Sequence, residues 1–208
     1  MKPSDIKTFF QDLDRRITKP IQVILTGGAA AVLRGSGRAT YDIDFEVRFA
    51  NSRDNTPQHW DALQSALAQT GQATGITPQY DENIDRWNAI PLPTRKSQRY
   101  AVFGRVEVLL LDVGLWAIGK LTRYLSSDIS DLREILGKTK PPPRALARLW
   151  GVALGLSAPS NMQALFRRQV DAFFEAYAQE IWGASGDPTI LKRQFLSAAQ
   201  KTRAKKSR

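Results

Sequence analysis

The sequence predicts an α+β fold, in which a sheet is flanked by helices and a helical region follows at the C-terminal end. Short β-branched and apolar runs, of which Ile21–Leu25 is the clearest, are typical of strands and lie before residue 113. Beyond residue 140, apolar side chains recur at helical spacing instead. Hydrophobic residues make up 42% of the 208, which is enough for a core of ordinary size.

The chain opens with elements of both kinds. Apolar residues three and four apart predict an amphipathic helix over residues 1–16, and a strand over Ile21–Leu25 follows. The alanine-rich run 29–33 favours a helix, so we expect Gly27 and Gly28 to turn the chain between strand and helix. A turn without side chains lets a phosphate group approach the backbone, and the dipole of the following helix favours negative charge there.

The middle of the chain alternates between strands and helices. The predicted elements are a strand over 42–49, a helix over 60–69, an irregular loop over 80–99 and a strand over 105–112. The segment that follows is predicted to be helical, either as one helix that places Lys120 and Asp131 on one face or as two helices, over 113–125 and 126–137. Three consecutive prolines follow at 141–143, and they mark a boundary because they cannot continue a helix. We therefore expect a core domain over 1–139 and a helical C-terminal region over 140–208, with helices over 145–156 and 163–182.

A pair of aspartates carries the clearest chemistry. Asp42 and Asp44 stand two residues apart in the second strand, so the pleat places both carboxylates on one face while Ile43 and Phe45 point to the core. Two carboxylates on one face are hard oxygen ligands that suit Mg²⁺ or Mn²⁺. The alternative is a half-exposed strand with two solvated aspartates.

The order of these features resembles a known family. The residues that carry the resemblance are Gly27 and Gly28, Arg38, Thr40, Asp42 and Asp44. Together they resemble the signature of the DNA polymerase β-like minimal nucleotidyltransferase superfamily, in particular the AbiEii- and MenT-type toxins of type IV toxin–antitoxin systems. The resemblance implies a polymerase β-like mixed sheet and nucleotidyl transfer from a nucleoside triphosphate, with Gly27, Gly28, Arg38 and Thr40 among the nucleotide-binding residues.

The resemblance also implies further site residues. Glu107, in the strand 105–112, resembles the superfamily's third carboxylate and would bind metal with the aspartate pair; Asp112 competes for that role, although it fits a helix N-cap better. Lys120 would neutralise the triphosphate and bind the nucleotide. Asp131 resembles the C-terminal catalytic acid, with Asp128 as its competitor. The structural alternatives are a polar residue on an open strand face for Glu107 and a helix-face ion pair between Lys120 and Asp131.

The net charge of +10 is concentrated near the C-terminus. From residue 192 onward the chain contains seven basic and no acidic residues, which predicts a basic tail over 192–208. Such a tail can bind RNA phosphates, contact an acidic protein or increase solubility. The resemblance favours RNA, because it implies the 3′ end of tRNA as acceptor and a cognate antitoxin protein as partner.

Composition excludes several classes of protein. The chain has no cysteine, which excludes disulfides and thiolate chemistry, and its single histidine, His59, cannot form a histidine-rich metal site. No run is apolar enough to span a membrane, and a cytoplasmic location is expected. Three alternatives to RNA modification stay open: AMPylation of a protein, modification of a small molecule, and an inactive fold that binds RNA or protein.

Overall fold

The computed structural model describes residues 1–87 and 89–206, and these form an α+β fold in two compact units. The first unit comprises Met1–Ile84 and Ser97–Leu111, and the second comprises Asp85–Lys96 and Asp112–Arg208. The boundary expected near residue 140 falls inside the second unit. Within the described part of the chain, no helix combines the length and apolar character that a membrane crossing requires.

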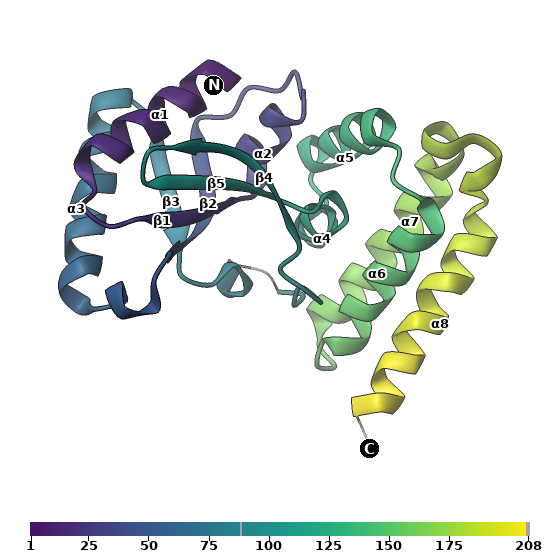
Figure 1. Cartoon of the computed structure of the whole chain (residues 1–208). Coiled ribbons are helices and arrows are strands. Elements are labelled where there is room, and N and C mark those ends of the chain that lie inside the picture. The colour runs from purple at the N-terminus through teal and green to yellow at the C-terminus, as the bar shows by residue number, and fades with distance from the viewer. Residues whose placement is uncertain (88, 207–208) are drawn as a thin grey trace. The chain divides into compact units, whose positions relative to one another are not determined.

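The first unit is built on a five-stranded mixed sheet with the order β3-β2-β1-β5-β4 (Figure 1). The central strand, β1 (Ile21–Leu25), pairs antiparallel with β2 (Asp42–Phe49) and parallel with β5 (Val106–Leu111). The edge strand β3 (Thr77–Asp81) runs parallel to β2, and the other edge strand β4 (Ser97–Phe103) runs antiparallel to β5. The expected mixture of strand directions is therefore present.

Helices of the first unit cover one face of this sheet. They are α1 (Pro3–Arg16), α2 (Gly27–Leu33) and α3 (Pro57–Thr74), with a short 3-10 turn at Ser52–Asp54. A second 3-10 turn, Ile84–Trp87, begins at the last residue of the segment Met1–Ile84 and belongs otherwise to the second unit. The Phe9 and Phe10 rings of α1 pack edge-on against Phe45 of β2, with centroids 6.5 and 6.2 Å away. Because strand side chains alternate, the opposite face of β2 carries its acidic residues.

The second unit is helical. Its helices are α4 (Val113–Arg123), α5 (Ser126–Thr139), α6 (Pro143–Leu156), α7 (Asn161–Trp182) and α8 (Pro188–Lys206), with a 3-10 turn at Gly183–Gly186. Trp150 is central to its core: the indole stacks on Phe174 at 5.4 Å and its N–H donates to the Gly114 carbonyl over 2.9 Å. A buried Trp needs such a partner for its polar N–H.

Two sequence predictions need correction, and one helix was not anticipated. The basic residues 192–206, for which the sequence analysis gave no secondary structure, form most of α8, whose Leu191, Phe195 and Ala199 are buried at helical spacing. Residues 207 and 208 of the predicted tail lie outside the described residues. The region 80–99, expected to be irregular, contains the end of β3 and the start of β4. Helix α3 is also longer than the predicted 60–69.

Candidate functional site

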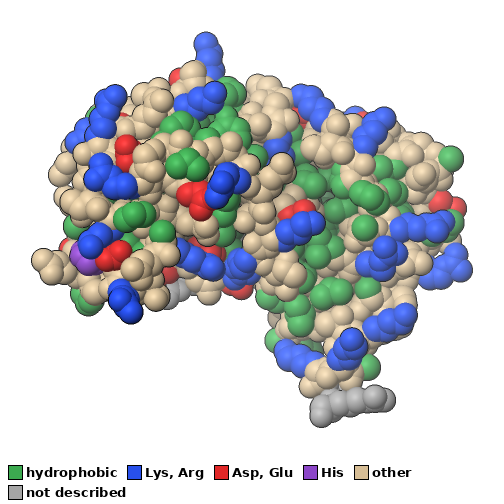
Figure 2. Space-filling view, viewed as in Figure 1, with side chains coloured by type: hydrophobic (Ala, Val, Ile, Leu, Met, Phe, Trp, Pro, Cys, Tyr) green, Lys and Arg blue, Asp and Glu red, His purple; other side chains and the backbone are tan. Residues whose placement is uncertain are grey.

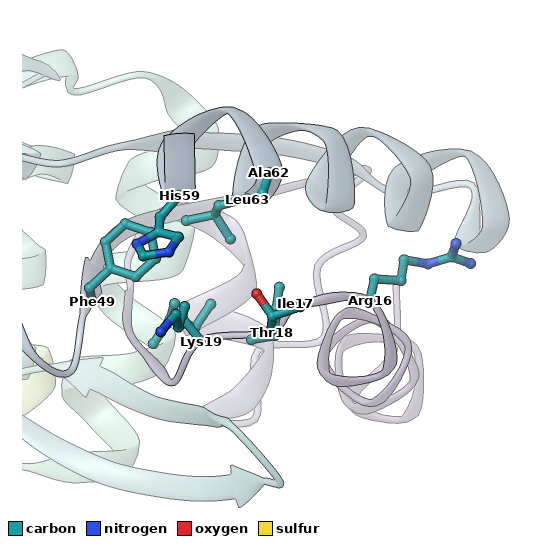
Figure 3. A pocket seen from close by; sticks show the side chains of 9 residues that line it. Arg16, Ile17, Thr18, Lys19, Phe49, His59, Ala62 and Leu63 are labelled. Atoms are coloured by element: carbon teal, nitrogen blue, oxygen red, sulfur yellow. The ribbon is translucent and has the colours of Figure 1, made fainter. Parts of the chain in front are cut away.

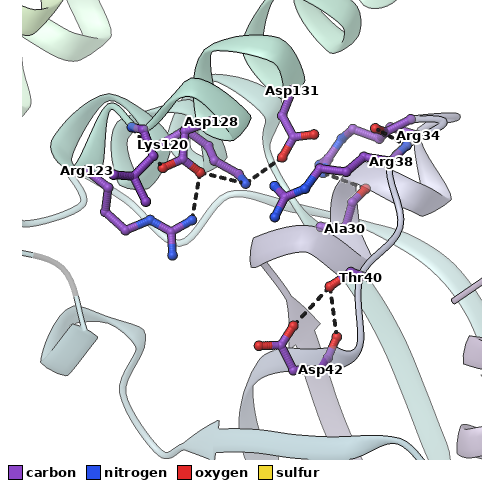
Figure 4. Close-up of polar contacts among 11 residues, drawn as sticks. Ala30, Arg34, Arg38, Thr40, Asp42, Lys120, Arg123, Asp128 and Asp131 are labelled. Carbon is purple, nitrogen blue, oxygen red and sulfur yellow. Dashed lines mark hydrogen bonds and ion pairs between the residues drawn. The ribbon is translucent and has the colours of Figure 1, made fainter.

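The aspartate pair lies at the start of β2, where two neighbours orient Asp42. The Thr40 hydroxyl donates to Asp42 Oδ1 over 2.9 Å (Figure 4), and the Gln79 amide donates to Oδ2 over 3.3 Å. Gln79 can reach Asp42 because the parallel register places it opposite Asp44 on the adjacent strand. Outer hydrogen bonds of this kind fix the direction in which a ligating carboxylate points.

Asp44 lies against the first turn of α2. The Thr26 N–H donates to the Asp44 carbonyl over 3.0 Å, which places Asp44 beside the end of β1. A Cβ at Gly27 would lie 1.8 Å from Asp44 Oδ2, and a Cβ at Gly28 would lie 2.6 Å from the Thr40 hydroxyl. Gly27 also has a φ of +59°. Both glycines are therefore required by the close approach of site side chains, in addition to the turn between strand and helix that the sequence predicts.

Glu46 is a third acid on the same face of β2 that the sequence analysis missed. It is completely buried, accepts the Ile84 N–H over 2.9 Å and forms an ion pair with the Arg48 guanidinium over 2.5 Å. The alternation of side chains along a strand, which puts Asp42 and Asp44 on one face, puts Glu46 on the same face. The position of Glu46 could therefore have been predicted from the sequence. Its contacts give it a structural role, since it fixes Ile84 to the sheet.

Glu107 does not join the aspartate pair. It is paired with Gln22 in the parallel register, whereas Asp44 is level with Thr26, four residues along β1. At about 3.3 Å per residue, this separates the two carboxylates by roughly 13 Å along the strand direction alone. The predicted set of three metal ligands is therefore not assembled.

Glu107 forms hydrogen bonds with other polar groups. Its carboxylate accepts the Gln22 amide N–H over 2.9 Å and an Arg99 N–H over 2.7 Å. These hydrogen bonds, first that from Gln22, lower the pKa of Glu107. The competing candidate, Asp112, accepts the Gly114 N–H over 2.9 Å at the start of α4, as an N-cap does.

Without Glu107, few side chains are left that could bind a metal ion beside Asp42 and Asp44. In residues 1–87 and 89–206, no group of three or more acidic or histidine side chains is arranged to hold a metal ion. Asp42 and Asp44 still fit Mg²⁺ or Mn²⁺, because Mg²⁺ keeps several waters and is usually held by one or two carboxylates together with substrate phosphates.

The remaining predicted nucleotide-binding residues lie between α2 and β2. Arg38 is exposed, and its backbone N–H donates to the Ser36 hydroxyl over 3.2 Å. Thr40 is 6% exposed, donates to Asp42 and occupies the space that a Cβ at Gly28 would need, so it organises the site from within.

A second charged cluster lies inside the second unit. Lys120 Nζ donates to Asp128 Oδ1 over 3.0 Å and to Asp131 Oδ2 over 2.7 Å, and Arg123 donates to Asp128 over 2.7 Å (Figure 4). Lys120, Asp128 and Asp131 are at most 2% exposed. Two helices rather than one bring them together, because α4 ends at Tyr124 in a left-handed conformation with φ 56°.

The electrostatics of this cluster favour its charged state. Burial raises the pKa of Asp128, but the hydrogen bonds and positive charges of Arg123 and Lys120 outweigh it, and the net shift is downward. A buried charge without a partner is costly. The ammonium of Lys120 is therefore committed to two carboxylates within its own unit, which supports the ion-pair alternative while its catalytic role stays a prediction.

A hollow in the first unit lies away from the aspartates. Its lining includes Lys19, Phe49, His59 and Leu63 (Figure 3). Phe49 is paired with Ile21 and ends β2, whereas Asp42 begins that strand. The hollow is thus at the opposite end of β2 from the candidate site. His59 accordingly has a local role: its ring nitrogen lies 2.8 Å from the Asp54 carbonyl near the start of α3.

The fold and these clusters define an α+β protein with a five-stranded mixed sheet and a C-terminal helical region. Comparison of the chain with protein-family models, with curated proteins and with solved structures finds no match. The function is therefore argued from the residues of the chain.

Proposed function

We propose that the chain is a metal-dependent nucleotidyltransferase of the polymerase β-like class that transfers a nucleoside monophosphate from an NTP to an RNA hydroxyl, such as the 3′ end of tRNA. The observation that carries the proposal is the aspartate pair, with Asp42 and Asp44 on one strand face and Asp44 against Gly27. Thr40 and Gln79 hold Asp42 in a fixed orientation, which is a property expected of a ligand residue.

The reaction would be an in-line displacement. The acceptor oxygen forms a bond to the α-phosphorus while the bond to the pyrophosphate oxygen breaks, and the acceptor proton leaves to solvent. Bound Mg²⁺ or Mn²⁺ would supply positive charge to the phosphate oxygens and lower the pKa of the acceptor hydroxyl. Asp42 and Asp44 would hold the ion, and the exposed Arg38 guanidinium would bind phosphate oxygens.

The biological role in this proposal is that of a toxin. Blocking the 3′ end of tRNA prevents aminoacylation, and a cognate antitoxin would then be the partner that restrains it. One observation favours a second candidate, an inactive fold that binds RNA: the carboxylate expected from Glu107 is not assembled with the aspartates.

Label transfer tests the proposal. Purified protein is incubated with Mg²⁺ or Mn²⁺ and each labelled NTP in turn, with total tRNA in one set and protein extract in another. Wild type is compared with Asp42→Asn, and Asp61→Asn, which changes an exposed acid of α3, is the matched control. Transfer to tRNA by wild type and Asp61→Asn alone supports the proposal.

Two other outcomes of the label-transfer assay would point to a different function. Asp42-dependent label on protein alone identifies AMPylation. The absence of label from every acceptor, with tRNA still bound, favours the inactive binding module.

A further inference from the structure

The surplus of positive charge belongs entirely to one unit. The first unit contains eleven basic and eleven acidic residues, whereas the second contains nineteen basic and nine acidic residues. Solubility alone does not require such segregation, because a net charge spread over both units would serve equally well. The location of the surplus therefore points to a polyanion that contacts the second unit.

Within that unit, α6 and α8 contain eight basic residues and no acidic residue. The two helices pack in parallel at very short range. A Cβ at Gly151 would lie 2.2 Å from the Phe195 carbonyl oxygen, and one at Gly155 would lie 2.6 Å from Thr202 Cβ. Basic side chains gather over this region of the surface, as Figure 2 shows. The contact fixes the two helices as one rigid basic surface.

Helical geometry identifies which basic residues share one side of this pair. Arg144 and Arg148 precede Gly151 by seven and three residues, so they continue the ridge of α6 that borders α8. On α8, Lys192 points toward α7, where it pairs with Glu175. At 100° per residue, Lys201 and Lys205 project on the side of α8 opposite to Lys192.

We propose that Arg144, Arg148, Lys201 and Lys205 form a surface that binds the phosphate backbone of a nucleic acid. All four side chains are exposed. The surface differs from the aspartate site; it deepens the proposed function by naming how an RNA acceptor is held, and it rests on that function only for the choice of RNA as the physiological ligand.

Two other partners fit less well. Protein interfaces are enriched in aromatic residues and depleted in lysine, and neither α6 nor α8 has an exposed large aromatic side chain. A membrane-surface helix needs a free apolar face, whereas Leu191, Phe195 and Ala199 of α8 are buried within the unit.

Salt-dependent binding tests the surface without any catalysis. The full chain is titrated into a fluorescein-labelled 20-base-pair RNA duplex without NTP, and anisotropy is measured between 50 and 200 mM KCl. One variant replaces Arg144, Arg148, Lys201 and Lys205 with glutamine. The matched control replaces four exposed basic residues of the first unit, Lys2, Lys7, Arg15 and Arg53, with glutamine. Each variant loses four positive charges, so the two have the same net charge.

We expect the surface variant to bind at least tenfold more weakly at 100 mM salt. Its slope of log K against log salt should be smaller by about 3 to 4, since each phosphate contact contributes about 0.9. The control should stay within threefold of wild type. The double variants Arg144→Gln/Arg148→Gln and Lys201→Gln/Lys205→Gln should each lose about half of the slope, which keeps the test valid if the fourfold variant folds poorly.

Equal weakening by both fourfold variants would overturn the proposal, because net charge alone would then explain binding. Lack of binding by wild type at 50 mM salt would overturn it as well. Asp42→Asn should bind RNA as wild type does, so failure of nucleotidyl transfer and failure of this surface give different results.

Discussion

Asp44 Oδ2 occupies the space that a Cβ at Gly27 would need, since the two positions are 1.8 Å apart. Gly27 is thus a condition for the position of the carboxylate that we propose as a metal ligand. The left-handed φ of +59° at Gly27 adds a second reason, because L side chains are strained there.

Gly27→Ala should lower the free energy of unfolding by at least about 2 kcal/mol, from backbone strain and overpacking together. Adding Asp44→Ala should recover part of this loss, because it removes the carboxylate oxygen and carbon nearest to the new Cβ. Urea denaturation of the two single variants and the double variant measures the coupling. Additive effects would show that the two residues do not meet. Gly37→Ala, where a Cβ meets nothing within 4 Å, is the control.

Glu46→Ala should lower the free energy of unfolding by about 1 to 3 kcal/mol, because it leaves the buried Ile84 N–H without its acceptor. Glu46→Gln keeps an acceptor oxygen and should cost less. Chemical denaturation measures the difference between the two variants. Equal costs would contradict the role that we assign to the Ile84 contact.

The variant Glu107→Gln tests whether Glu107 lies outside the proposed metal site, as its register on β5 indicates. Its ion pair with Arg99 is partly solvent-exposed, so the loss of stability should stay below about 1 kcal/mol. In the label-transfer assay the Glu107→Gln variant should be as active as wild type, because Glu107 on β5 lies far from the aspartates on β2 along the strand direction. A loss as large as that of Asp42→Asn would restore Glu107 as a ligand residue.

Lys120→Met should lower the free energy of unfolding by about 3 to 5 kcal/mol at pH 7, because it leaves Asp128 and Asp131 buried without their shared cation. The wild-type pKa of Asp128 is lowered on folding, so its contribution is fully present above the unfolded value near 3.8 and is lost as pH falls through the folded value. The penalty of Lys120→Met should therefore shrink as pH falls from about 3.8 through the lowered folded pKa of Asp128, because the wild-type contribution of Asp128 is lost over that range.

Denaturation of wild type and Lys120→Met between pH 3 and 8 measures this dependence. A penalty that is constant with pH would show that the cluster does not depend on charge.

Gly151→Ala should lower the stability of the second unit by about 1 to 3 kcal/mol, because the new Cβ meets the Phe195 backbone oxygen, which cannot move independently of α8. Gly137→Ala in α5 meets nothing within 4 Å and should be stabilising by about 0.5 to 1 kcal/mol. Thermal unfolding compares the two. Stabilisation by both would show that α6 and α8 do not pack at this distance.

Local sequence signals predicted the elements that their own residues determine. The strand Ile21–Leu25 begins and ends where its β-branched run does, and the helix expected over 163–182 is within α7. β3 was missed because Thr-Pro-Gln-Tyr-Asp lacks apolar alternation, and its Pro78 suits the edge of a sheet. α8 was missed because its charges masked the buried positions Leu191 and Phe195.

The candidate site was predictable only where one strand supplies it. Asp42 and Asp44 share a face for reasons local to β2, and Glu46 could have been found by the same alternation. The position of Glu107 depends on the register between β5 and β1, which tertiary pairing decides. The 100° periodicity of a single helix places Lys120 and Asp131 on one face but about three turns apart, and their direct pairing depends on the turn at Tyr124, which brings two helices together.

The position of β1 at the centre of the sheet has a consequence for synthesis on the ribosome. β1 emerges early and can pair with β2 as soon as that strand follows, but its other edge stays open until β5 has been made. The nascent first unit therefore presents an unpaired, apolar strand edge for the whole time that residues 50–105 are being translated, which is the interval in which a chaperone or a misplaced strand can bind it.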